Sequence, residues 1–335
     1  MKAEKKNIIC ENRNPLEKVI PLDTPYTVAV DPCNLCNFKC KFCAMQTTEK
    51  KQNYVKQQMK LDLFKKIVDD LACFPQRLKV LRINGQGEPL LNKNFCEMVQ
   101  YAKEKNVADW IETITNGSLL EPSINQRLVD SGINRIRISI ESLDVAGYKN
   151  MAQTTLDFSK FVENIKDLYV RSRGKTEVYI KIVDAAVPLQ EQQEKFYSLF
   201  GDICDRIFID RVIPLWSDFN EINQSFNIAS QQGMHGQKIK NIKVCPFPFY
   251  SFIINPEGEV TACCADWQRK LVLGNVQKES LQEIWHGKKY HDFLITLLQG
   301  KKDNYEMCAK CVLPMYDCND DIDQYAEQIL ERMSR

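Results

Sequence analysis

Histidine is scarce in this sequence of 335 residues, and long apolar runs are missing from it. The three histidines, His235, His286 and His291, lie far from the densest group of cysteines, which argues against a His-rich zinc hydrolase. No stretch reaches the roughly eighteen consecutive apolar residues that a transmembrane helix needs. The opening residues, MKAEKKNIICENRNP, also lack the apolar centre of a signal peptide. We therefore expect a cytoplasmic protein that does not bind membranes.

An excess of one charge sign is also missing. Lys and Arg number 45 against 44 for Asp and Glu, so the composition gives no electrostatic reason to expect binding to nucleic acid or to a membrane surface. Small substrates or single partners fit this balance better. The length exceeds that of one typical compact domain and predicts one large domain with a smaller one.

Residues 26–213 alternate β-branched or apolar runs with segments of helical apolar spacing, which is typical of repeated βα units and a parallel sheet. The expected strands are 26–30, 78–84, 110–115, 135–140, 177–183 and 206–212. The expected helices are 61–74, 94–106, 123–132, 158–172 and 189–201. Eight units would close a full barrel and the sequence supplies fewer. The predicted fold is therefore α/β, an open partial (β/α)6 barrel with ligands at the carboxyl ends of its strands.

The pattern changes after this barrel. Residues 245–267 predict two strands around the turn NPEG, residues 279–300 predict a helix, and CAKC follows at 308–311. The expected divisions of the chain are an N-terminal arm at 1–25, the barrel at 26–213, a linker or lid at 214–244, a small C-terminal α+β domain at 245–318 and a terminal helix at 319–335.

Cysteine is abundant, with 14 in the chain, and without an export signal these should be reduced thiols suited to metal or redox chemistry. Cys33, Cys36, Cys40 and Cys43 directly follow the first predicted strand. Four thiolates could close a tetrahedral zinc site. Alternatively, the last three could ligate a 4Fe-4S cluster and leave its fourth iron open for catalysis. The position at a strand end in a βα series favours the cluster, because structural zinc sites usually lie in small loop-rich modules.

The segment CNFKCKFC, with Phe42 before its last cysteine, resembles the Cys-x3-Cys-x2-Cys loop of the radical S-adenosylmethionine (SAM) enzymes. Later motifs resemble the same family in order: GQGEP after the second strand, ITNG after the third and SIESLD at the end of the fourth. The resemblance implies that Cys36, Cys40 and Cys43 ligate the cluster and that Cys33 does not. It also implies SAM contacts for residues on successive strand ends, namely Phe42, Gly85, Gly87, Glu88, Asn116, Ser139, Glu141 and Lys181.

Within this set the resemblance gives different parts of SAM to different residues. Glu88, with the two glycines, would bind the methionine amino group. Asn116, Ser139 and Glu141 would contact the carboxylate and ribose, although the family often has Asp where Glu141 stands, and Lys181 would reach the carboxylate. The alternative for Glu88 is an N-cap or turn carboxylate, and for Asn116 it is ordinary turn chemistry.

A second cysteine set consists of Cys245, Cys263, Cys308 and Cys311, enough to fill every iron of another 4Fe-4S cluster. CPFPFYSFIINPEGEVTACCADW and LGNVQKESLQEIWHG resemble the C-terminal SPASM/Twitch domain of radical SAM enzymes. The full SPASM pattern has more cysteines, so we expect one auxiliary cluster, and two [4Fe-4S] clusters in all. Cys264 and Cys318 are alternates, and adjacent strand residues should point apart, so only one of Cys263 and Cys264 should face a cluster. A structural zinc ribbon is the other interpretation.

The resemblance implies a radical SAM oxidoreductase. Such an enzyme cleaves SAM reductively to a 5'-deoxyadenosyl radical, abstracts a substrate hydrogen and passes an electron to the auxiliary cluster, oxidising a hydroxyl, sugar or amino-acid group. An electron donor such as flavodoxin or ferredoxin would serve it. The alternatives are a maturase that cross-links or epimerises a ribosomal peptide, and a non-catalytic iron-sulfur or zinc protein. Asp210, Arg211 and Trp216 are candidate substrate contacts, although ordinary ion pairing and packing would also explain them.

Overall fold

The structure is a computed structural model, and it describes residues 2–6, 14–47, 54–214, 231–317 and 320–334. Two residues named above, Trp216 and Cys318, and most of the expected linker lie outside this part of the chain. No helix in the described ranges is long and apolar enough to cross a membrane.

One sheet of nine strands forms the frame of the molecule, in the order β6-β5-β4-β3-β2-β1-β7-β8-β9. Strands β1 to β6 run parallel, as the βα pattern predicts. They are β1 (Thr27–Val30), β2 (Leu78–Ile83), β3 (Ala108–Thr115), β4 (Arg135–Ile140), β5 (Glu177–Val183) and β6 (Arg206–Asp210). The six predicted strands are therefore confirmed, with ends that differ by no more than two residues.

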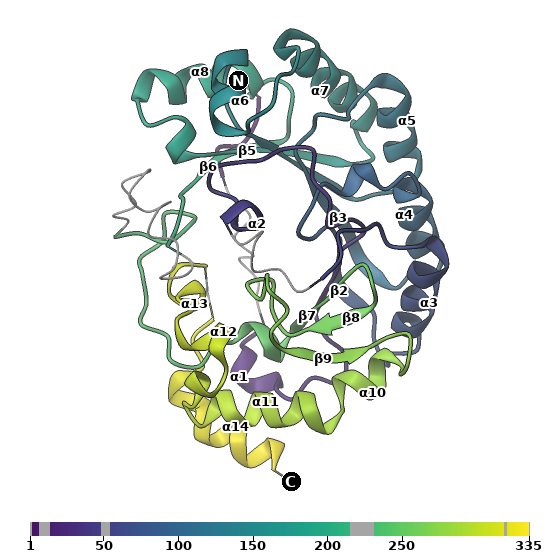
Figure 1. Cartoon of the computed structure of the whole chain (residues 1–335), viewed down its shortest axis with the longest axis vertical. Helices are drawn as coiled ribbons and strands as arrows, with labels where there is room; N and C mark the ends of the chain where they lie inside the picture. Colours follow the sequence, from purple (N-terminus) through teal and green to yellow (C-terminus); the bar gives the residue numbers. More distant parts are fainter. Residues whose placement is uncertain (1, 7–13, 48–53, 215–230, 318–319, 335) are drawn as a thin grey trace.

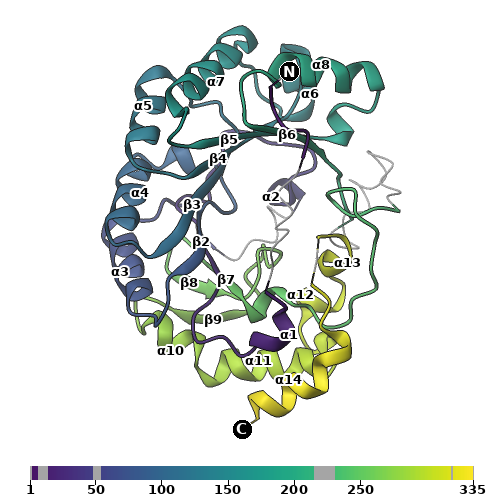
Figure 2. The ribbon, with the colours of Figure 1, turned by 180° about the vertical axis from the view of Figure 1, so that it is seen from behind.

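Helices cover the outer face of this sheet, while its inner face curves around the centre of the molecule (Figures 1 and 2). The covering helices are α3 (Leu61–Ala72), α4 (Phe95–Glu104), α5 (Pro122–Asp130), α7 (Phe158–Ser172) and α8 (Gln190–Phe200). In α3, Phe64, Ile67, Val68 and Leu71 are buried, a spacing that places them on one face of a helix. These helices and the open, partial barrel are as predicted.

The small C-terminal unit continues the barrel sheet instead of standing apart from it. Strand β7 (Ser251–Ile254) pairs in parallel with β1, and the antiparallel β8 (Glu259–Thr261) and β9 (Val272–Asn275) follow. Gly258 turns the chain before β8 with a φ of 88°, which favours glycine. The two strands around NPEG are confirmed, whereas β9 has no counterpart in the sequence prediction.

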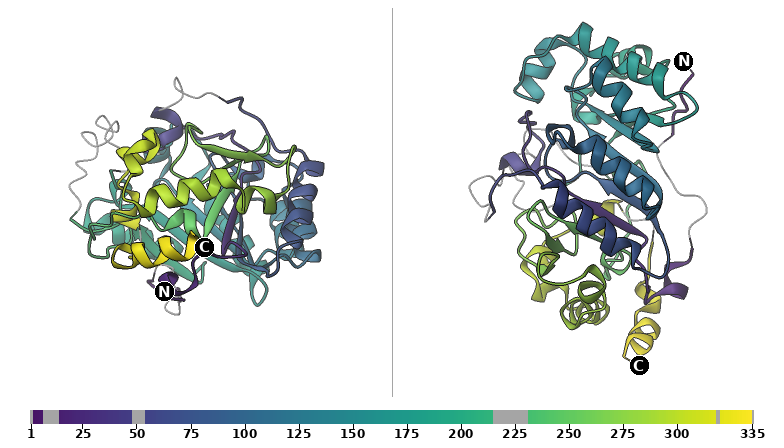
Figure 3. Two further views of the ribbon diagram at one scale, coloured as in Figure 1. Left: turned by 90° about the horizontal axis from the view of Figure 1, so that it is seen from below. Right: turned by 90° about the vertical axis from the view of Figure 1, so that its right-hand side faces the viewer.

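The single helix predicted over residues 279–300 is wrong, because the structure has two helices there, α10 (Leu281–Trp285) and α11 (Lys288–Leu298). Gly287 separates them, and a Cβ at this position would lie 2.5 Å from Glu283 O. A larger residue would therefore push the chain apart at the junction. Figure 3 shows the C-terminal helices packed at one end of the molecule.

The remaining elements are shorter. The other α-helices are α1 (Leu16–Val19), α2 (Ala44–Thr47), α6 (Val145–Met151), α12 (Glu306–Ala309), α13 (Leu313–Asp317) and the terminal α14 (Ala326–Met333). The 3-10 helices are η2 (Pro89–Leu91), η3 (Asp184–Ala186), η5 (Phe247–Phe249), η6 (Lys302–Asn304) and η7 (Asp323–Tyr325).

Strand residues alternate between an apolar outer face and a polar inner face. In β2, Leu81 and Ile83 are fully buried in the core, so Arg82 between them points to the inner face. The same alternation places Arg137 of β4 on the inner face, between the buried Ile136 and Ile138. The inside of the barrel is therefore lined by charged residues at this level.

Candidate active site

The loop after β1 carries the first cysteine group. Cys33 is fully buried, and its thiol donates to the backbone oxygen of Leu35 at 3.6 Å. Cys36 is exposed, whereas Cys40 and Cys43 are partly exposed. Cys33 therefore differs from the three cysteines expected to ligate a cluster, because its thiol points into the backbone of its own loop.

The loop after β2 is locked against this cysteine loop. The buried Asp31 accepts a hydrogen bond at Oδ2 from the backbone amide of Gln86 at 3.0 Å. A Cβ at Gly85 would lie 2.2 Å from Asp31 Cγ, and one at Gly87 would lie 2.2 Å from Leu35 O. Both glycines of GQGEP are therefore required for the close approach of the two loops, whether or not they also contact SAM.

Glu88 links the second and third strand ends. Its Oε1 accepts hydrogen bonds from Leu90 N at 3.0 Å and from the Thr115 hydroxyl at 2.7 Å, and its Oε2 accepts one from Asn116 N at 2.7 Å. Burial raises the pKa of the Glu88 carboxyl to about 7, although these hydrogen bonds favour the carboxylate. Glu88 thus has the N-cap role that was its alternative interpretation. Its contact with the amino group of SAM stays a prediction.

Asn116 connects the end of β3 to the cysteine loop. Its Nδ2 donates to Asn37 Oδ1 at 2.9 Å and lies 4.0 Å from Cys36 Sγ, while its Oδ1 accepts from Ser118 N at 2.9 Å. Phe42, another expected SAM contact, is half-buried in the same cysteine loop. The end of the third strand therefore lies beside the exposed cysteine.

The ends of β4 and β5 complete this side of the barrel. Glu141 is buried. Burial raises the pKa of Glu141 to about 7, while Lys181 on β5 acts in the opposite direction. Ser139 lies opposite Lys181 in the sheet register, and the Glu141 amide donates to the Tyr148 hydroxyl at 3.3 Å. The expected SAM contacts of the fourth and fifth strands thus lie together.

The second cysteine set comes from three separate segments. Cys245 precedes η5, Cys263 follows β8, and Cys308 and Cys311 lie in and directly after α12. Cys263 and Cys311 contact one small apolar cluster formed by Ile213, Ala265 and Leu313. Cys245 and Cys308 contact the main core of the protein. The fold therefore brings β8 and the chain after α12 to one place, although they are far apart in sequence.

Cys263 and Cys264 do not lie in a strand, as the expectation that they point apart assumed, so that expectation stays a prediction. Strand β8 ends at Thr261, so both cysteines lie in the turn that follows, where the alternation of a strand no longer applies. Cys263 contacts the same small apolar cluster as Cys311, whereas Cys264 is exposed.

The donor chemistry of both sets fits iron-sulfur clusters. The described cysteines are free thiols, the ligand type that these clusters use. In the ranges that the structure covers, no three His, Cys, Asp or Glu side chains gather closely enough to hold one metal ion. Neither cysteine group is thus gathered around a single metal position within those ranges.

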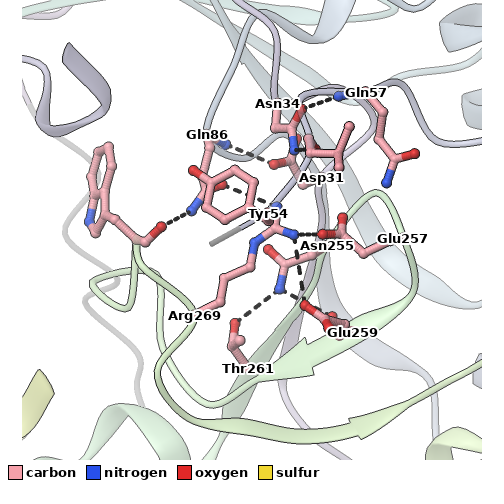
Figure 4. Close-up of polar contacts among 12 residues, drawn as sticks. Asp31, Asn34, Tyr54, Gln57, Gln86, Asn255, Glu257, Glu259, Thr261 and Arg269 are labelled. Carbon is pink, nitrogen blue, oxygen red and sulfur yellow. Dashed lines mark hydrogen bonds and ion pairs between the residues drawn. The ribbon is translucent and has the colours of Figure 1, made fainter. Parts of the chain in front are cut away.

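Sequence reasoning missed a polar network between the two halves of the chain (Figure 4). Gln86 donates from Nε2 to Trp267 O at 3.0 Å and accepts at Oε1 from Arg269 at 3.2 Å. The Arg269 guanidinium also lies 3.7 Å from the centre of the Tyr54 ring and pairs with Glu257. The place of Gln86 between two motif glycines was an available signal, whereas nothing in the sequence pointed to Arg269.

A second missed group lies on the inner face of the barrel. The carboxylate of Glu112 on β3 pairs with Arg82 at 2.7 Å, Arg137 at 2.7 Å and Arg135 at 3.0 Å. Burial alone would raise the pKa of Glu112, but Arg137 and Arg82 outweigh it and hold this pKa at about 2. Glu112 is therefore a buried carboxylate anion that orients guanidinium groups from two neighbouring strands.

His235 joins the barrel to α13. Its Nδ1 lies 2.9 Å from Asp210 Oδ1 and its Nε2 lies 3.1 Å from Asp317 Oδ1, while Lys181 pairs with the other oxygen of Asp210 at 3.3 Å. Burial alone would lower the pKa of His235, but hydrogen bonds to the two aspartates outweigh it and raise this pKa to about 9. Asp210 is thus engaged in ion pairs. Arg211 donates its backbone amide to Met234 O at 2.8 Å.

Comparisons with known proteins agree with this arrangement. The cofactor-modifying protein of the tungsten-containing aldehyde ferredoxin oxidoreductase from Pyrococcus furiosus is 25% identical over 83% of this chain and 85% of its own length. The S-adenosyl-L-methionine-dependent 2-deoxy-scyllo-inosamine dehydrogenase of Niallia circulans is 23% identical over 85% of this chain and 91% of its own.

Two solved structures share the fold. BtrN in complex with AdoMet and 2-DOIA has a TM-score of 0.53 at 19% identity, over 85% of this chain and 92% of its own. SuiB of Streptococcus suis bound to the precursor peptide SuiA has a TM-score of 0.61 at 16% identity, over 83% of this chain and 69% of its own.

Family models match both halves of the chain. That of the radical SAM superfamily matches residues 30–183, which include the first cysteine loop and the strands β2 to β5. That of the SPASM iron-sulfur cluster-binding domain matches residues 245–312, which include the second cysteine set. The chain belongs to the radical SAM superfamily and carries a C-terminal SPASM domain.

Proposed function

We propose that this protein is an oxidoreductase that uses SAM to remove hydrogen from a small-molecule substrate. Its two domains imply iron-sulfur clusters and SAM as cofactors. Cys36, Cys40 and Cys43 would hold the SAM-binding 4Fe-4S cluster, and Cys33 would not take part. When bound, this cluster with SAM would supply reductive carbon-sulfur cleavage and a 5'-deoxyadenosyl radical able to take a substrate hydrogen atom.

The residues around the first cysteine group would bind and orient SAM. The rigid backbone of Gly85 and Gly87, held by Asp31, would present the loop to the methionine amino group, with Glu88 fixing its shape. Asn116 would position the ligand beside Cys36, because its amide already approaches that sulfur to 4.0 Å. Ser139, Glu141 and Lys181 would contact the remaining polar groups, with Phe42 packing beside them.

The second set would hold one auxiliary 4Fe-4S cluster through Cys245, Cys263, Cys308 and Cys311. Cys264 is the alternate that the turn after β8 makes available, and Cys318 lies outside the described residues. With the first group this gives two clusters. Flavodoxin or ferredoxin is the class of electron donor that would supply the first of them.

One observation carries the choice of an oxidation. Strand β7 of the C-terminal unit pairs with β1, and Ile253 lies opposite Ala29, which lies opposite Arg82, so the unit that carries the second cysteine set adjoins the barrel strands. Gln86 adds a direct link between the GQGEP loop and the loop that carries Cys263 and Cys264. An acceptor for a substrate electron would therefore lie beside the space in which the substrate is held.

The dehydrogenase of Niallia circulans, a relative over most of both chains, supports this reaction class. Peptide modification is the second candidate, favoured by the fold that the chain shares with SuiB, whose structure holds a precursor peptide. That likeness concerns the fold and leaves the substrate of this protein open.

Anaerobic reconstitution followed by iron and sulfide analysis tests the proposal, together with a 5'-deoxyadenosine assay using dithionite. We expect about eight irons per chain and SAM cleavage. Cys40→Ala should lose about half of the iron and all of the cleavage. Wild-type protein that holds iron but never forms 5'-deoxyadenosine would instead support the non-catalytic alternative. Deuterium transfer from labelled alcohols or peptides into 5'-deoxyadenosine then separates the two substrate classes.

A further inference from the structure

Arg82 and Arg137, on the inner face of the barrel, have more hydrogen-bond donors and charge than their protein partners use. We infer that these two arginines bind an oxoanion group of the substrate, a carboxylate or a phosphate ester. This inference rests on the proposed function, since it names the substrate class of the same site.

The carboxylate of Glu112 holds the two arginines in place. Arg82 donates from Nε and Arg137 from one terminal nitrogen, both to Oε1 of Glu112 and both at 2.7 Å. Glu112 is only 1% exposed, so water does not compete for this oxygen. Two guanidinium groups from β2 and β4 therefore share one carboxylate oxygen from the strand between them.

The positive and negative charges around Glu112 do not balance. Arg135 takes the other oxygen of Glu112 and has a second carboxylate, Glu177, at 2.9 Å. Three arginines thus face two carboxylates, and the excess positive charge belongs to Arg82 and Arg137. The side chain of Arg137 is only 16% exposed, and a charge buried in this way is costly unless an opposite charge compensates it. A bound anion would provide that compensation.

The arginines also keep unused donors. The side chain of Arg82 is 43% exposed, and within the described residues its only partner is Glu112, bonded through Nε, so both terminal nitrogens are available. Arg137 Nε is buried and has no hydrogen-bond partner in that part of the chain. The planar fork of an arginine matches the two oxygens of a carboxylate or phosphate group.

The position of the pair matches a substrate site. Arg82 lies on β2 just before the GQGEP loop, and Arg137 lies two residues before Ser139 on the same face of β4. On its other side, Arg82 lies opposite Ala29 of β1, which in turn lies opposite Ile253 of β7, the first strand of the C-terminal unit. An anion held here would lie between the proposed SAM contacts and the second cysteine set.

Calorimetric titration of the anaerobically reconstituted full chain, loaded with SAM, tests the inference. Inorganic phosphate and acetate are the probes, one for each source of the oxoanion. We expect saturable binding of one or both, weakened about tenfold or more in Arg82→Gln. Arg82→Lys keeps the charge without the fork and should show an intermediate loss. Arg137→Lys provides a second test that leaves the Glu112 pairing possible.

Arg77→Gln is the matched control, because Arg77 is an exposed arginine that pairs with Asp109 away from this group. It should bind the probes as the wild type does. Equal binding of the probes by Arg77→Gln and Arg82→Gln would overturn the inference, provided that both variants have native circular dichroism spectra. The absence of saturable binding to the wild type would also overturn it. The 5'-deoxyadenosine assay without substrate tests the proposed function independently of anion binding. Cleavage without anion binding rejects the inference alone, whereas a wild type that never cleaves SAM rejects the proposed function.

Discussion

Arg269 donates a hydrogen bond to Gln86 Oε1 over 3.2 Å and so connects the loop between β8 and β9 to the loop after β2. The same Gln86 side chain donates to Trp267 O, so one residue bonds twice to the segment that follows Cys263 and Cys264. Gln86 stands between the glycines that pack against Asp31 and Leu35. The two cysteine-bearing regions are therefore held at a fixed separation through the backbone of one tight loop.

Replacing Gln86 by Leu should weaken this connection. The change removes two hydrogen bonds and leaves the partly buried Trp267 carbonyl and the Arg269 guanidinium short of partners, so the free energy of unfolding should fall by about 1–3 kcal/mol. Urea unfolding followed by circular dichroism measures this loss. Gln100→Leu removes an exposed contact with Glu104 and is the control, expected to change stability by less than about 0.5 kcal/mol. Equal effects of the two changes would show that the Gln86 contacts add nothing to stability.

The buried state of Cys33 predicts that it is dispensable for the cluster. Its thiol bonds to Leu35 O, and a serine hydroxyl can make the same contact in nearly the same volume. Reconstituted Cys33→Ser should keep the iron content and SAM cleavage of the wild type. Cys36→Ser should lose about four irons, since a cluster held by three cysteines loses one of them.

Loss of iron in Cys33→Ser equal to that in Cys36→Ser would return a site of four thiolates to consideration. Cys73→Ser, at an exposed cysteine on the far end of α3, controls for general effects of replacing a thiol.

Glu88→Gln should show whether Glu88 serves only to hold the shape of the GQGEP loop or also binds SAM through its charge. Both carboxylate oxygens accept hydrogen bonds from Leu90, Thr115 and Asn116, and the glutamine NH2 would face donors on one side. We expect a loss of about 1–3 kcal/mol in the free energy of unfolding and weaker SAM binding by calorimetry. The exposed Glu97→Gln, which removes a surface pair with Lys65, should change neither quantity measurably. Unchanged SAM affinity in a destabilised Glu88→Gln would limit Glu88 to its N-cap role.

The strands and helices of the barrel could be predicted because each is read from local periodicity. The Glu112 group could not, because Arg82, Glu112 and Arg137 come from three strands and meet only through the sheet register. A charged residue at alternate strand positions also looks like a solvent-facing residue in sequence. Similarly, the place of Cys263 and Cys264 outside a strand depends on where β8 ends, and strand ends are poorly specified by composition.

The ion pairs of His235 predict a pH dependence of stability. Its folded-state pKa is about 9 against an ordinary value of 6.5, so the folded protein keeps a proton on this ring that the unfolded chain releases. The stabilisation is complete below pH 6.5 and is lost as the pH rises through 9. It amounts to ~3.5 kcal/mol at most, because one pKa unit corresponds to about 1.4 kcal/mol.

Urea unfolding at several values between pH 6.5 and 9 measures this contribution. His235→Gln keeps a polar side chain but cannot be charged, so its stability should be lower at the acidic end and should fall less steeply with rising pH than that of the wild type. The exposed His286→Gln is the matched control, since His286 contacts the ring of Phe74 and not a carboxylate. If the free energy of unfolding changes with pH in the same way in the wild type and in His235→Gln, the imidazolium between Asp210 and Asp317 does not hold α13 to the barrel.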